Sequence, residues 1–433
     1  MKYATYSKYK PSPMAWLDQL PTHWNAASLR WMSKRYAGGT PDKGNEAYWE
    51  DGDIPWINSG AVNDGYITQP SELITREGFA NSSAKWIPKD ALVMALAGQG
   101  KTKGMVAQLG IPTTCNQSMA ALIPDHRFAP RYLYYWLTAN YQNIRNLAGG
   151  EARDGLNLEM LGSIPCPVPP VDEQQTIARF LDAKTAQIDA LVAQKRQLID
   201  KLKEKRQALI ARTVTRGLPP EAAKAAGLEP APAMKNSGVD WLGVVPADWV
   251  ITAVWHQFFL GRGRVISHED ISENPGPYPV YSSQTENDGV LGYLGSFDFD
   301  GEYITWTTDG ANAGTVFTRS GKFNCTNVCG TLKAKRLGRI DNRYVTYALS
   351  IATAEFVRHD INPKLMNNVM KSIRFALPSK IEQTAIADYL DTELRKLESL
   401  GMEIEVAVDR LTEYRQALIT STVTGKIDVR ELA

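Results

Sequence analysis

The chain has few of the residues that build disulfide frameworks and metal sites. Its 433 residues include four cysteines and five histidines. Four cysteines are too few for a disulfide framework in a chain of this length, so we expect reduced thiols in a cytoplasmic protein. Cys325 and Cys329 have a spacing seen in zinc sites, but no second pair of cysteines or histidines completes one. The sequence therefore predicts no metal centre.

Long apolar runs and an excess of one charge are also missing. No stretch approaches the roughly 20 apolar residues of a membrane-spanning helix. Residues 1–6 lack the apolar run of a signal peptide, so we expect no membrane partner. Lysine and arginine number 48 against 47 acidic residues, which gives a net charge of +1. This balance neither indicates nor excludes nucleic-acid binding, because such binding needs a basic face and not a basic average.

The main positive feature of the sequence is an internal repeat. Residues 173–182 read EQQTIARFLD, and residues 382–391 read EQTAIADYLD. The pentapeptide RQALI occupies both 206–210 and 415–419. The offset is 209 in both cases (382 − 173 and 415 − 206), so the two copies align without a gap. Because insertions are tolerated in loops and rarely in helices, the repeat predicts one long helix in each copy.

Apolar residues in both copies follow the heptad spacing of a coiled-coil seam, with alternating steps of four and three. Pro169 and Pro170 precede the first predicted helix and Pro378 precedes the second, as is typical of helix starts. The globular segment between the helices can return the chain, so we predict that the helices pair antiparallel; pairing with a second chain is the alternative. The predicted seam residues are Ile177, Leu181, Ile188, Leu191, Leu198, Leu202 and Leu209 in the first copy, and Ile386, Leu390, Leu397, Leu400, Ile404, Leu411 and Leu418 in the second.

A second, shorter repeat indicates that a globule precedes each helix. Residues 16–24 (WLDQLPTHW) match residues 241–249 (WLGVVPADW). Both globules mix short apolar runs with turns, which predicts an α+β fold. The whole chain is predicted as two such globules alternating with two long helices that form an antiparallel coiled coil, with a pseudo-twofold internal repeat. The predicted segments are globule 1–165, helical region 166–218, a Pro/Ala-rich linker at 219–236, globule 237–376 and helical region 377–433.

One loop resembles a phosphate-binding loop but does not meet its requirements. Residues 95–102 read ALAGQGKT, and such a loop should open a helix. Gly104, Gly110 and Pro112 disfavour a helix at that place. The corresponding segment 309–315 keeps its glycines but has no Lys-Thr pair. We therefore predict neither an ATP site nor catalytic residues, and instead a glycine hairpin that carries Gln99, Lys101 and Lys103 outward.

Polar side chains of the kinds that read base edges gather in the loops of both globules. Any one of them is more often a solvated loop residue, but as a class in two parallel globules they favour DNA binding. Five basic residues are candidates for phosphate contacts, which position a protein without reading sequence: Lys333, Lys335, Arg336, Arg339 and Arg343. The predicted DNA-binding residues are Gln99, Lys101, Lys103, Asn116 and Gln117 in the first globule, and Arg262, Arg264, Ser283, Gln284, Thr308, Asp309, Asn312 and Asn327 in the second.

Further phrases of the sequence match a known family. They include GGTP at 38–41, PVPPVDEQQTIARFLD at 167–182, YPVYSSQ at 278–284 and TDGANAG at 308–314, together with the repeated RQALI. On these residues the chain resembles the specificity subunits of Type I restriction–modification enzymes over nearly its whole length. Both domain types and both helices occur in the order that this family shows.

The resemblance implies a division of labour. Each globule would be a target-recognition domain that binds one half of a split, asymmetric double-stranded DNA target through the major groove. The helical pair would set the gap between the halves and dock two modification subunits, which bring S-adenosylmethionine and methylate adenine. Restriction subunits, which use ATP and Mg²⁺, would join them. The chain itself would have no catalytic role and no cofactor.

Two alternatives come from other classes of protein. The first is a coiled-coil adaptor whose globules bind carbohydrate or protein; acidic or purely aromatic loops would favour it, and the loops here are rich in Lys, Gln, Asn and Arg. The second is an NTPase that uses Lys101 in a phosphate-binding loop.

Overall fold

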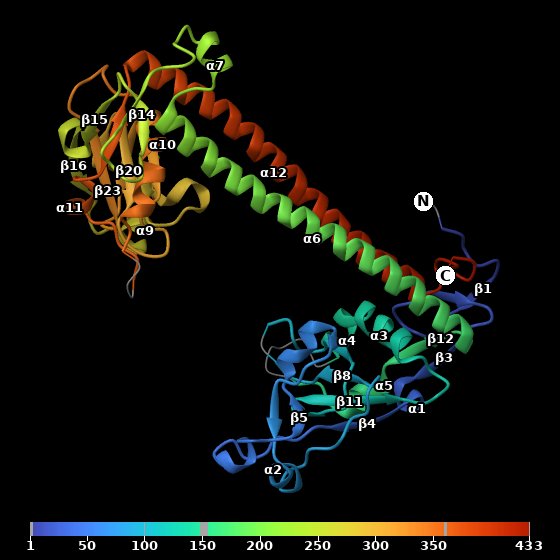
Figure 1. Ribbon diagram of the computed structural model, residues 1–433. Helices are drawn as coiled ribbons and strands as arrows, with labels where there is room; N and C mark the ends of the chain where they lie inside the picture. Colours follow the sequence, from blue (N-terminus) through green and yellow to red (C-terminus); the bar gives the residue numbers. More distant parts are fainter. Residues whose placement is uncertain (1–2, 99, 148–154, 359–361, 433) are drawn as a thin grey trace. The chain divides into compact units, whose positions relative to one another are not determined.

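The computed structural model describes residues 3–98, 100–147, 155–358 and 362–432, which form two compact units (Figure 1). Unit 1 comprises Met1–Lys195 and Val406–Ala433, and unit 2 comprises Arg196–Glu405. Each unit contains one globule together with a stretch of each of two long helices, α6 (Val171–Arg216) and α12 (Lys380–Val423).

A five-stranded sheet forms the centre of unit 1. The strand order is β4-β11-β8-β9-β6, and only β6 and β9 pair in parallel. Alternate residues of a strand face opposite sides of a sheet. Leu92 and Met94 accordingly pack in the core beneath helix α3, while Val93 and Ala95 pack in a second core on the other face. Burial of both faces explains why β8 is apolar throughout. The bounds are β4 Ser33–Ala37, β6 Tyr66–Ile67, β8 Leu92–Ala95, β9 Val106–Leu109, β11 Met119–Pro124 and α3 Pro130–Ala139.

Smaller elements surround this sheet. A three-stranded sheet has the order β10-β5-β7, and two strand pairs, β1-β2 and β3-β12, lie outside it. The bounds are β1 Tyr9–Pro11, β2 Gln19–Pro21, β3 Asn25–Ser28, β5 Ile54–Ile57, β7 Glu72–Ile74, β10 Thr114–Cys115, β12 Pro165–Val168, α1 Leu29–Met32, α2 Arg76–Ala80, α4 Tyr141–Asn146, α5 Leu158–Ser163 and the 3₁₀ turns Glu46–Tyr48 and Ser59–Asp64.

Unit 2 repeats this plan. Its central sheet has the order β16-β23-β20-β21, which corresponds to β4-β11-β8-β9, and α10 takes the place of α3. A second four-stranded sheet has the order β18-β17-β22-β19. The bounds are β13 Met234–Asn236, β14 Val244–Pro246, β15 Val250–Ala253, β16 Phe258–Arg262, β17 Tyr278–Tyr281, β18 Val290–Leu294, β19 Phe299–Asp300, β20 Tyr303–Thr307, β21 Val316–Arg319, β22 Lys322–Cys325, β23 Cys329–Ala334, β24 Arg374–Leu377, α8 Val254–Gln257, α9 His268–Glu273, α10 Asn342–Ala352, α11 Asn367–Met370 and the 3₁₀ turns Glu286–Gly289 and Thr353–Glu355.

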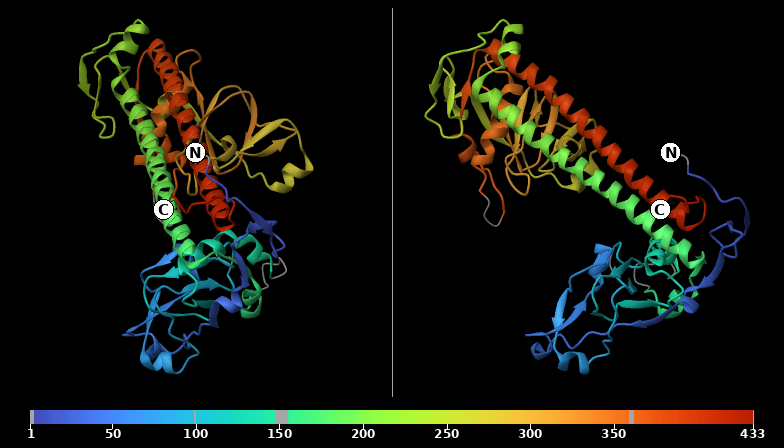
Figure 2. Two further views of the ribbon diagram at one scale, coloured as in Figure 1. Left: turned by 90° about the vertical axis from the view of Figure 1, so that its right-hand side faces the viewer. Right: turned by 45° about the vertical axis from the view of Figure 1, so that its right-hand side comes forward.

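The two long helices pair antiparallel, as the sequence predicts. In unit 1, Ile177 and Leu181 near the start of α6 share a core with Leu418 near the end of α12. In unit 2, Val214 near the end of α6 shares a core with Ile386 near the start of α12. Figure 2 shows the two helices side by side within each unit. The two fully buried tryptophans of the shorter repeat, Trp24 and Trp249, lie in these same cores.

The seam differs from the predicted heptads at three positions. Leu191, Leu198 and Leu400 are 41%, 44% and 43% exposed. In α6 the more buried residues are instead Val192 and Ile199. An undistorted α-helix drifts by about 20° per heptad relative to a strict seven-residue repeat, so the packed face moves to the next residue.

The Pro/Ala-rich segment 219–236 is more structured than the predicted linker. It contains α7 (Pro220–Ala225) and β13, and Ala223 is buried. Proline is favoured in the first turn of a helix and alanine in its interior, so the composition that suggested a tether also permits a short helix. The segment therefore contains regular structure, while its role as a linker stays a prediction.

Candidate functional site

The glycine-rich loop of unit 1 is a hairpin between two strands. The N–H of Ala95 donates to the carbonyl of Met105 at 3.0 Å, and the N–H of Gly104 donates to the carbonyl of Ala95 at 2.8 Å. Gly100 and Gly104 have φ of +64° and +84°, a region that favours glycine. Because the loop leads into strand β9 and not into a helix, it lacks the helix N-terminus that holds phosphate in an NTPase.

The hairpin turns only one of its two described lysines to solvent. Lys101 is exposed, but Lys103 is only 3% exposed. The prediction that Lys103 points outward was therefore wrong, since the turn that closes at Gly104 folds residue 103 against the globule. Gln99 lies outside the described residues.

A second turn meets this hairpin. The N–H of Leu96 donates to the carbonyl of Ser118 at 2.8 Å, and the N–H of Gly38 donates to the carbonyl of Met119 at 3.1 Å. A side chain at Gly38 would collide with the carbonyl oxygen of Cys115, so only glycine fits there. Three loops thus meet at one place: the end of β4, the β10–β11 turn and the β8–β9 hairpin.

Two predicted residues of unit 1 lie on the β10–β11 turn. Gln117 is exposed, and its side-chain oxygen accepts a hydrogen bond from the hydroxyl of Thr40. Asn116 is half-buried, and its N–H donates to the carbonyl of Ile57 at 3.0 Å. Its side-chain oxygen is buried without a hydrogen-bond partner among the described residues. Gln117 is therefore the better placed of the two to touch a ligand.

Unit 2 assembles the same three-loop cluster. The N–H of Thr308 donates to the carbonyl of Val328 at 2.8 Å, and the N–H of Gly263 donates to the carbonyl of Cys329 at 3.0 Å. A side chain at Gly263 would collide with the carbonyl oxygen of Cys325, as at Gly38 in unit 1. The backbone frame is the same in both units, while the side chains on it differ.

The frame of unit 2 carries several of its predicted residues at the surface. Arg262 is exposed, and its Nε donates to the carbonyl of Asn327 at 2.6 Å; Asn327 is also exposed. Arg264 pairs with Asp298 at 2.8 Å while its side chain stays 49% exposed.

Other predicted residues of unit 2 form contacts within the loops. The amide of Asn312 donates to the carbonyl of Ser283 at 3.1 Å. The side chain of Gln284 donates to the carbonyl of Val290. Asp309 accepts from the amide of Asn362 at 2.6 Å.

Thr308 is fully buried, so it cannot reach a ligand in this conformation. Its assignment as a DNA-binding residue needs correction for that reason: it is the residue whose N–H joins the hairpin to the adjacent turn.

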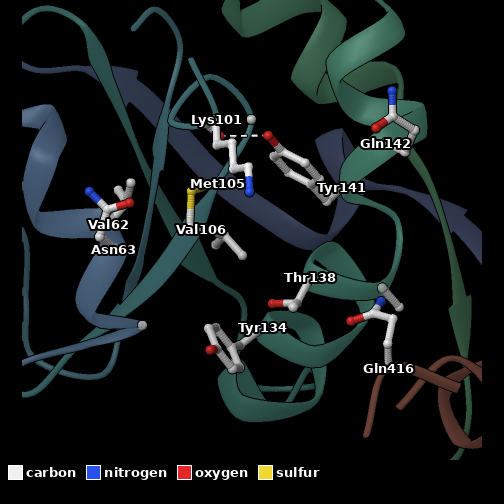
Figure 3. Close-up of a pocket in the computed structure, with 13 residues that line it drawn as sticks. Val62, Asn63, Lys101, Met105, Val106, Tyr134, Thr138, Tyr141, Gln142 and Gln416 are labelled. Atoms are coloured by element: carbon white, nitrogen blue, oxygen red, sulfur yellow. Dashed lines mark hydrogen bonds between the residues drawn. The ribbon is translucent and has the colours of Figure 1, made fainter. Parts of the chain in front are cut away.

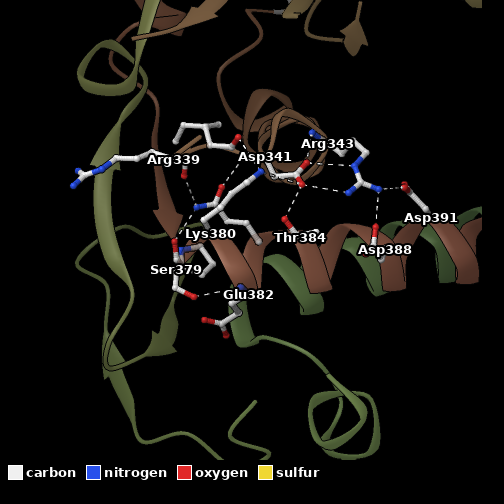
Figure 4. Close-up of polar contacts among 12 residues, drawn as sticks. Arg339, Asp341, Arg343, Ser379, Lys380, Glu382, Thr384, Asp388 and Asp391 are labelled. Carbon is white, nitrogen blue, oxygen red and sulfur yellow. Dashed lines mark hydrogen bonds and ion pairs between the residues drawn. The ribbon is translucent and has the colours of Figure 1, made fainter. Parts of the chain in front are cut away.

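The sequence suggests Arg343 as a phosphate contact, but in the structure its guanidinium is already paired with carboxylates. Its guanidinium contacts Asp341 at 3.2 Å, Asp388 at 2.8 Å and Asp391 at 2.7 Å (Figure 4). Lys380 adds an ion pair to Asp341 at 3.3 Å. Burial raises the pKa of Asp341, but the hydrogen bond and charge of Arg343, with the charge of Lys380, outweigh it and leave that pKa below its ordinary value. Arg343 therefore anchors α10 to α12.

A glutamine near the start of each long helix binds the backbone just before α3 or α10 in its unit. Sequence reasoning missed both glutamines. Gln174 accepts from the N–H of Ala129 at 2.9 Å and donates to the carbonyl of Pro169 at 2.9 Å. Gln383 accepts from the N–H of Asp341 at 2.9 Å and donates to the carbonyl of Pro378 at 2.9 Å. The signal in the sequence is the Glu-Gln pair at the start of both repeats.

A cavity lies beside the hairpin in each unit. In unit 1 it measures about 390 Å³, and Lys101 and Tyr141 line it (Figure 3). The hydroxyl of Tyr141 donates to the carbonyl of Lys101 at 2.5 Å. In unit 2 a cavity of about 430 Å³ lies at the corresponding place, between the hairpin base at Gly314 and helix α10. The two share a position and differ in their lining.

The described residues contain no group of three or more His, Cys, Asp or Glu residues arranged to hold a metal ion. In the same part of the chain, every helix is too short or too polar to cross a membrane.

Comparison with known proteins gives consistent matches. The family described as Type I restriction modification DNA specificity domain matches residues 24–201 and 254–407. The chain is 43% identical over 166 residues to the Type I restriction enzyme MpnII specificity subunit of Mycoplasma pneumoniae, which covers 37% of this chain and 49% of that protein. It is 32% identical over 155 residues to the EcoR124I/EcoR124II specificity subunit of Escherichia coli, which covers 35% of this chain and 38% of that protein. These two matches span less than two thirds of each of the two relatives.

The fold also has a counterpart among solved structures. A chain from a study of complex assembly and conformational transition in the type I R-M system matches with a TM-score of 0.72. The match covers 94% of this chain and 99% of that one at 13% sequence identity. At this identity the match shows a shared fold.

Proposed function

The chain belongs to the Type I restriction modification DNA specificity domain family, and from this premise we propose that it is the DNA-recognition subunit of a Type I restriction–modification complex. Each unit binds one half of a split, asymmetric target in double-stranded DNA. The observation that carries the proposal is the three-loop cluster, which is the same in backbone and different in exposed side chains. One scaffold with two sets of side chains suits two different base sequences.

The residues proposed to face DNA lie in the three-loop cluster or, for Ser283 and Gln284, in the neighbouring loop after β17, and the structure leaves each of them at least partly accessible. In unit 1 these are Lys101, Asn116 and Gln117; in unit 2 they are Arg262, Arg264, Ser283, Gln284, Asp309, Asn312 and Asn327. Their side chains are amides, cations, one hydroxyl and one carboxylate, which are the groups that recognise base edges or phosphates.

The paired helices α6 and α12 are proposed to set the gap between the two half-sites and to dock two modification subunits. Three exposed leucines, Leu191, Leu198 and Leu400, support the docking role, because the intramolecular seam leaves them at the surface. In this scheme the modification subunits bring S-adenosylmethionine and methylate adenine in the cytoplasm. Restriction subunits with ATP and Mg²⁺ complete the nuclease, and this chain supplies no catalytic group.

The test is to co-express the chain with its modification subunit and to map N6-methyladenine across the host genome by single-molecule sequencing. Two short blocks of defined sequence around a constant gap are expected. A stable complex that binds DNA and yields no new methylation would count against the proposed role. Absence of any complex would favour the coiled-coil adaptor.

A further inference from the structure

The loop that follows β5 in unit 1 corresponds to the loop that follows β17 in unit 2, and the two loops are closed differently. In unit 1 this loop follows β5, and backbone hydrogen bonds join it to strand β9 of the central sheet. The N–H of Gln108 donates to the carbonyl of Gly65 at 2.9 Å, and the N–H of Gly110 donates to the carbonyl of Ile67 at 2.8 Å. Between these two residues, Leu109 is fully buried.

In unit 2 a buried arginine occupies the position of Leu109. Arg319 ends β21 as Leu109 ends β9, at the same offset of 210 that relates Gly314 to Gly104. Its side chain is only 2% exposed. The corresponding loop, Ser282–Gly289, has no strand equivalent to β6 among the described residues. A side-chain contact therefore replaces a backbone one.

Arg319 holds this loop through one residue. Its Nη1 donates to the carboxylate of Asp288 at 2.6 Å, and its Nη2 donates to the backbone carbonyl of the same residue at 2.8 Å. The guanidinium lies 3.6 Å from the ring centroid of Tyr281 and 4.4 Å from that of Phe317, and Nε donates to the hydroxyl of Thr305 at 3.3 Å. Hydrogen bonds along the edge of the guanidinium and aromatic rings against its face fix it in one orientation.

The clamped segment has an unusual backbone. Asn287, Asp288 and Gly289 have φ of +48°, +53° and +78°. Non-glycine residues enter this left-handed region at a cost, and consecutive ones need support from their surroundings. Two charge-assisted hydrogen bonds from Arg319 to Asp288 supply such support.

The same loop carries two of the proposed DNA-facing residues. Ser283 and Gln284 lie between Tyr281 and the clamped turn. The N–H of Ser282 donates to the carbonyl of Gly289 at 2.9 Å, which closes the loop, and Asn312 of the neighbouring hairpin donates to the carbonyl of Ser283. The shape of the turn at Asp288 therefore determines where Ser283 and Gln284 lie.

We infer that Arg319 is a positioning residue for recognition of the second half of the DNA target: by clamping Asp288 it holds Ser283 and Gln284 in the arrangement that reads bases. The inference rests on the proposed function. Arg319 is buried and does not itself touch DNA. Unit 1 needs no such residue, because β6 pairing already fixes its loop.

The test compares two variants at Asp288, whose side chain is 70% exposed and tolerates replacement. Asp288→Asn keeps an acceptor oxygen and a residue type that tolerates positive φ; Asp288→Ala removes both. Glu286→Ala is the matched control, since it removes an exposed acid from the same loop without touching the clamp. Each variant is assembled with the modification subunit, and methylation rates are measured on duplexes with single base-pair changes in either half-site.

For Asp288→Ala we expect discrimination at the second half-site to fall by roughly tenfold, with discrimination at the first half-site unchanged. Asp288→Asn should retain most of the discrimination, and Glu286→Ala all of it. The inference is overturned if Asp288→Ala leaves discrimination at the second half-site within about twofold, if both half-sites lose it equally, or if Glu286→Ala matches it. A wild-type complex that discriminates at neither half-site would overturn the proposed function, and the inference with it.

Discussion

At the scale of single residues, the two units present different side chains at equivalent points of one frame. Gln117 and Asn327 occupy the same turn of the three-loop cluster, and both are exposed. The side chain of Gln117 accepts a hydrogen bond from the hydroxyl of Thr40. In Asn327 the backbone carbonyl accepts a hydrogen bond from Arg262. A difference of this kind changes what the turn can recognise without changing the turn.

Replacement of either residue by alanine should affect one half-site only. Gln117→Ala is expected to weaken binding of the cognate first half by about 1–3 kcal/mol, because an amide that bonds a base edge is lost, and Asn327→Ala should do the same for the second half. Competition binding with base-substituted duplexes measures this. Equal loss on all DNA sequences would show that these residues contact phosphates and do not read bases.

Asp341 makes the stability of unit 2 dependent on pH. Its pKa in the folded chain lies below the ordinary value of about 3.9, chiefly because Arg343 and Lys380 outweigh the effect of burial. A carboxyl with a lowered pKa stabilises the fold fully above its unfolded pKa, and that contribution is lost as pH falls through the folded pKa.

The expected result is a wild-type protein that is more stable than Asp341→Asn at neutral pH, with a difference that shrinks below about pH 4. Denaturant unfolding of the full chain at a series of pH values measures it. A difference that is constant down to pH 3 would mean that the asparagine acts through packing and not through charge.

At the scale of elements, each long helix buries one face against the other and against a globule. Leu181 of α6 is fully buried, while Leu191 is 41% exposed although the heptad pattern includes both. The heptad pattern predicted the helices and their antiparallel pairing correctly. It predicted the wrong packed residues where the helix drifts from a strict seven-residue period.

Two leucine substitutions in α6 distinguish a buried seam residue from an exposed one. Leu181→Ala should lower the free energy of unfolding by about 2–5 kcal/mol, because it leaves a cavity in the core. Leu191→Ala should lower it by less than about 1 kcal/mol in the isolated chain. Urea unfolding measures both. If Leu191→Ala instead weakens assembly with the modification subunit, that loss would support the docking role of the exposed leucines.

At the scale of the whole molecule, the chain joins two readers through one pair of helices. Linking two binding modules makes the second binding event intramolecular, so we expect the pair to bind DNA more tightly than either unit alone. This gain depends on a fixed relation between the two half-sites. The proposed role of α6 and α12 is to provide that relation.

An insertion of seven residues into α6 alone, between Lys195 and Leu209, should abolish methylation of the original split target. It lengthens one helix by about 10 Å relative to its partner and so breaks the match between the two copies. Methylation mapping of the variant complex is the measurement, and a soluble complex of unchanged stoichiometry is the control for assembly. Retention of the original target and gap would contradict the proposed role of the helices.

The local order of the chain follows from the sequence alone. A gapless repeat with heptad spacing determined two long helices, because a helix cannot absorb insertions without losing the register of its buried face. The prolines before Val171 and Lys380 determined where they begin. The glycine-rich segment of the first globule predicted a hairpin, and Gly104 and its match Gly314 both have positive φ in the structure.

Tertiary structure decided which side chains of the loops are accessible. Lys103 and Thr308 lie in polar loops by sequence, yet both are buried, and Arg343 is bound to three carboxylates. Contacts of this kind join residues far apart in the chain, as Arg319 joins Asp288, so no local pattern reveals them. The sequence determined the elements because helices and hairpins depend on near neighbours; the fold decided the site because exposure and pairing depend on distant ones.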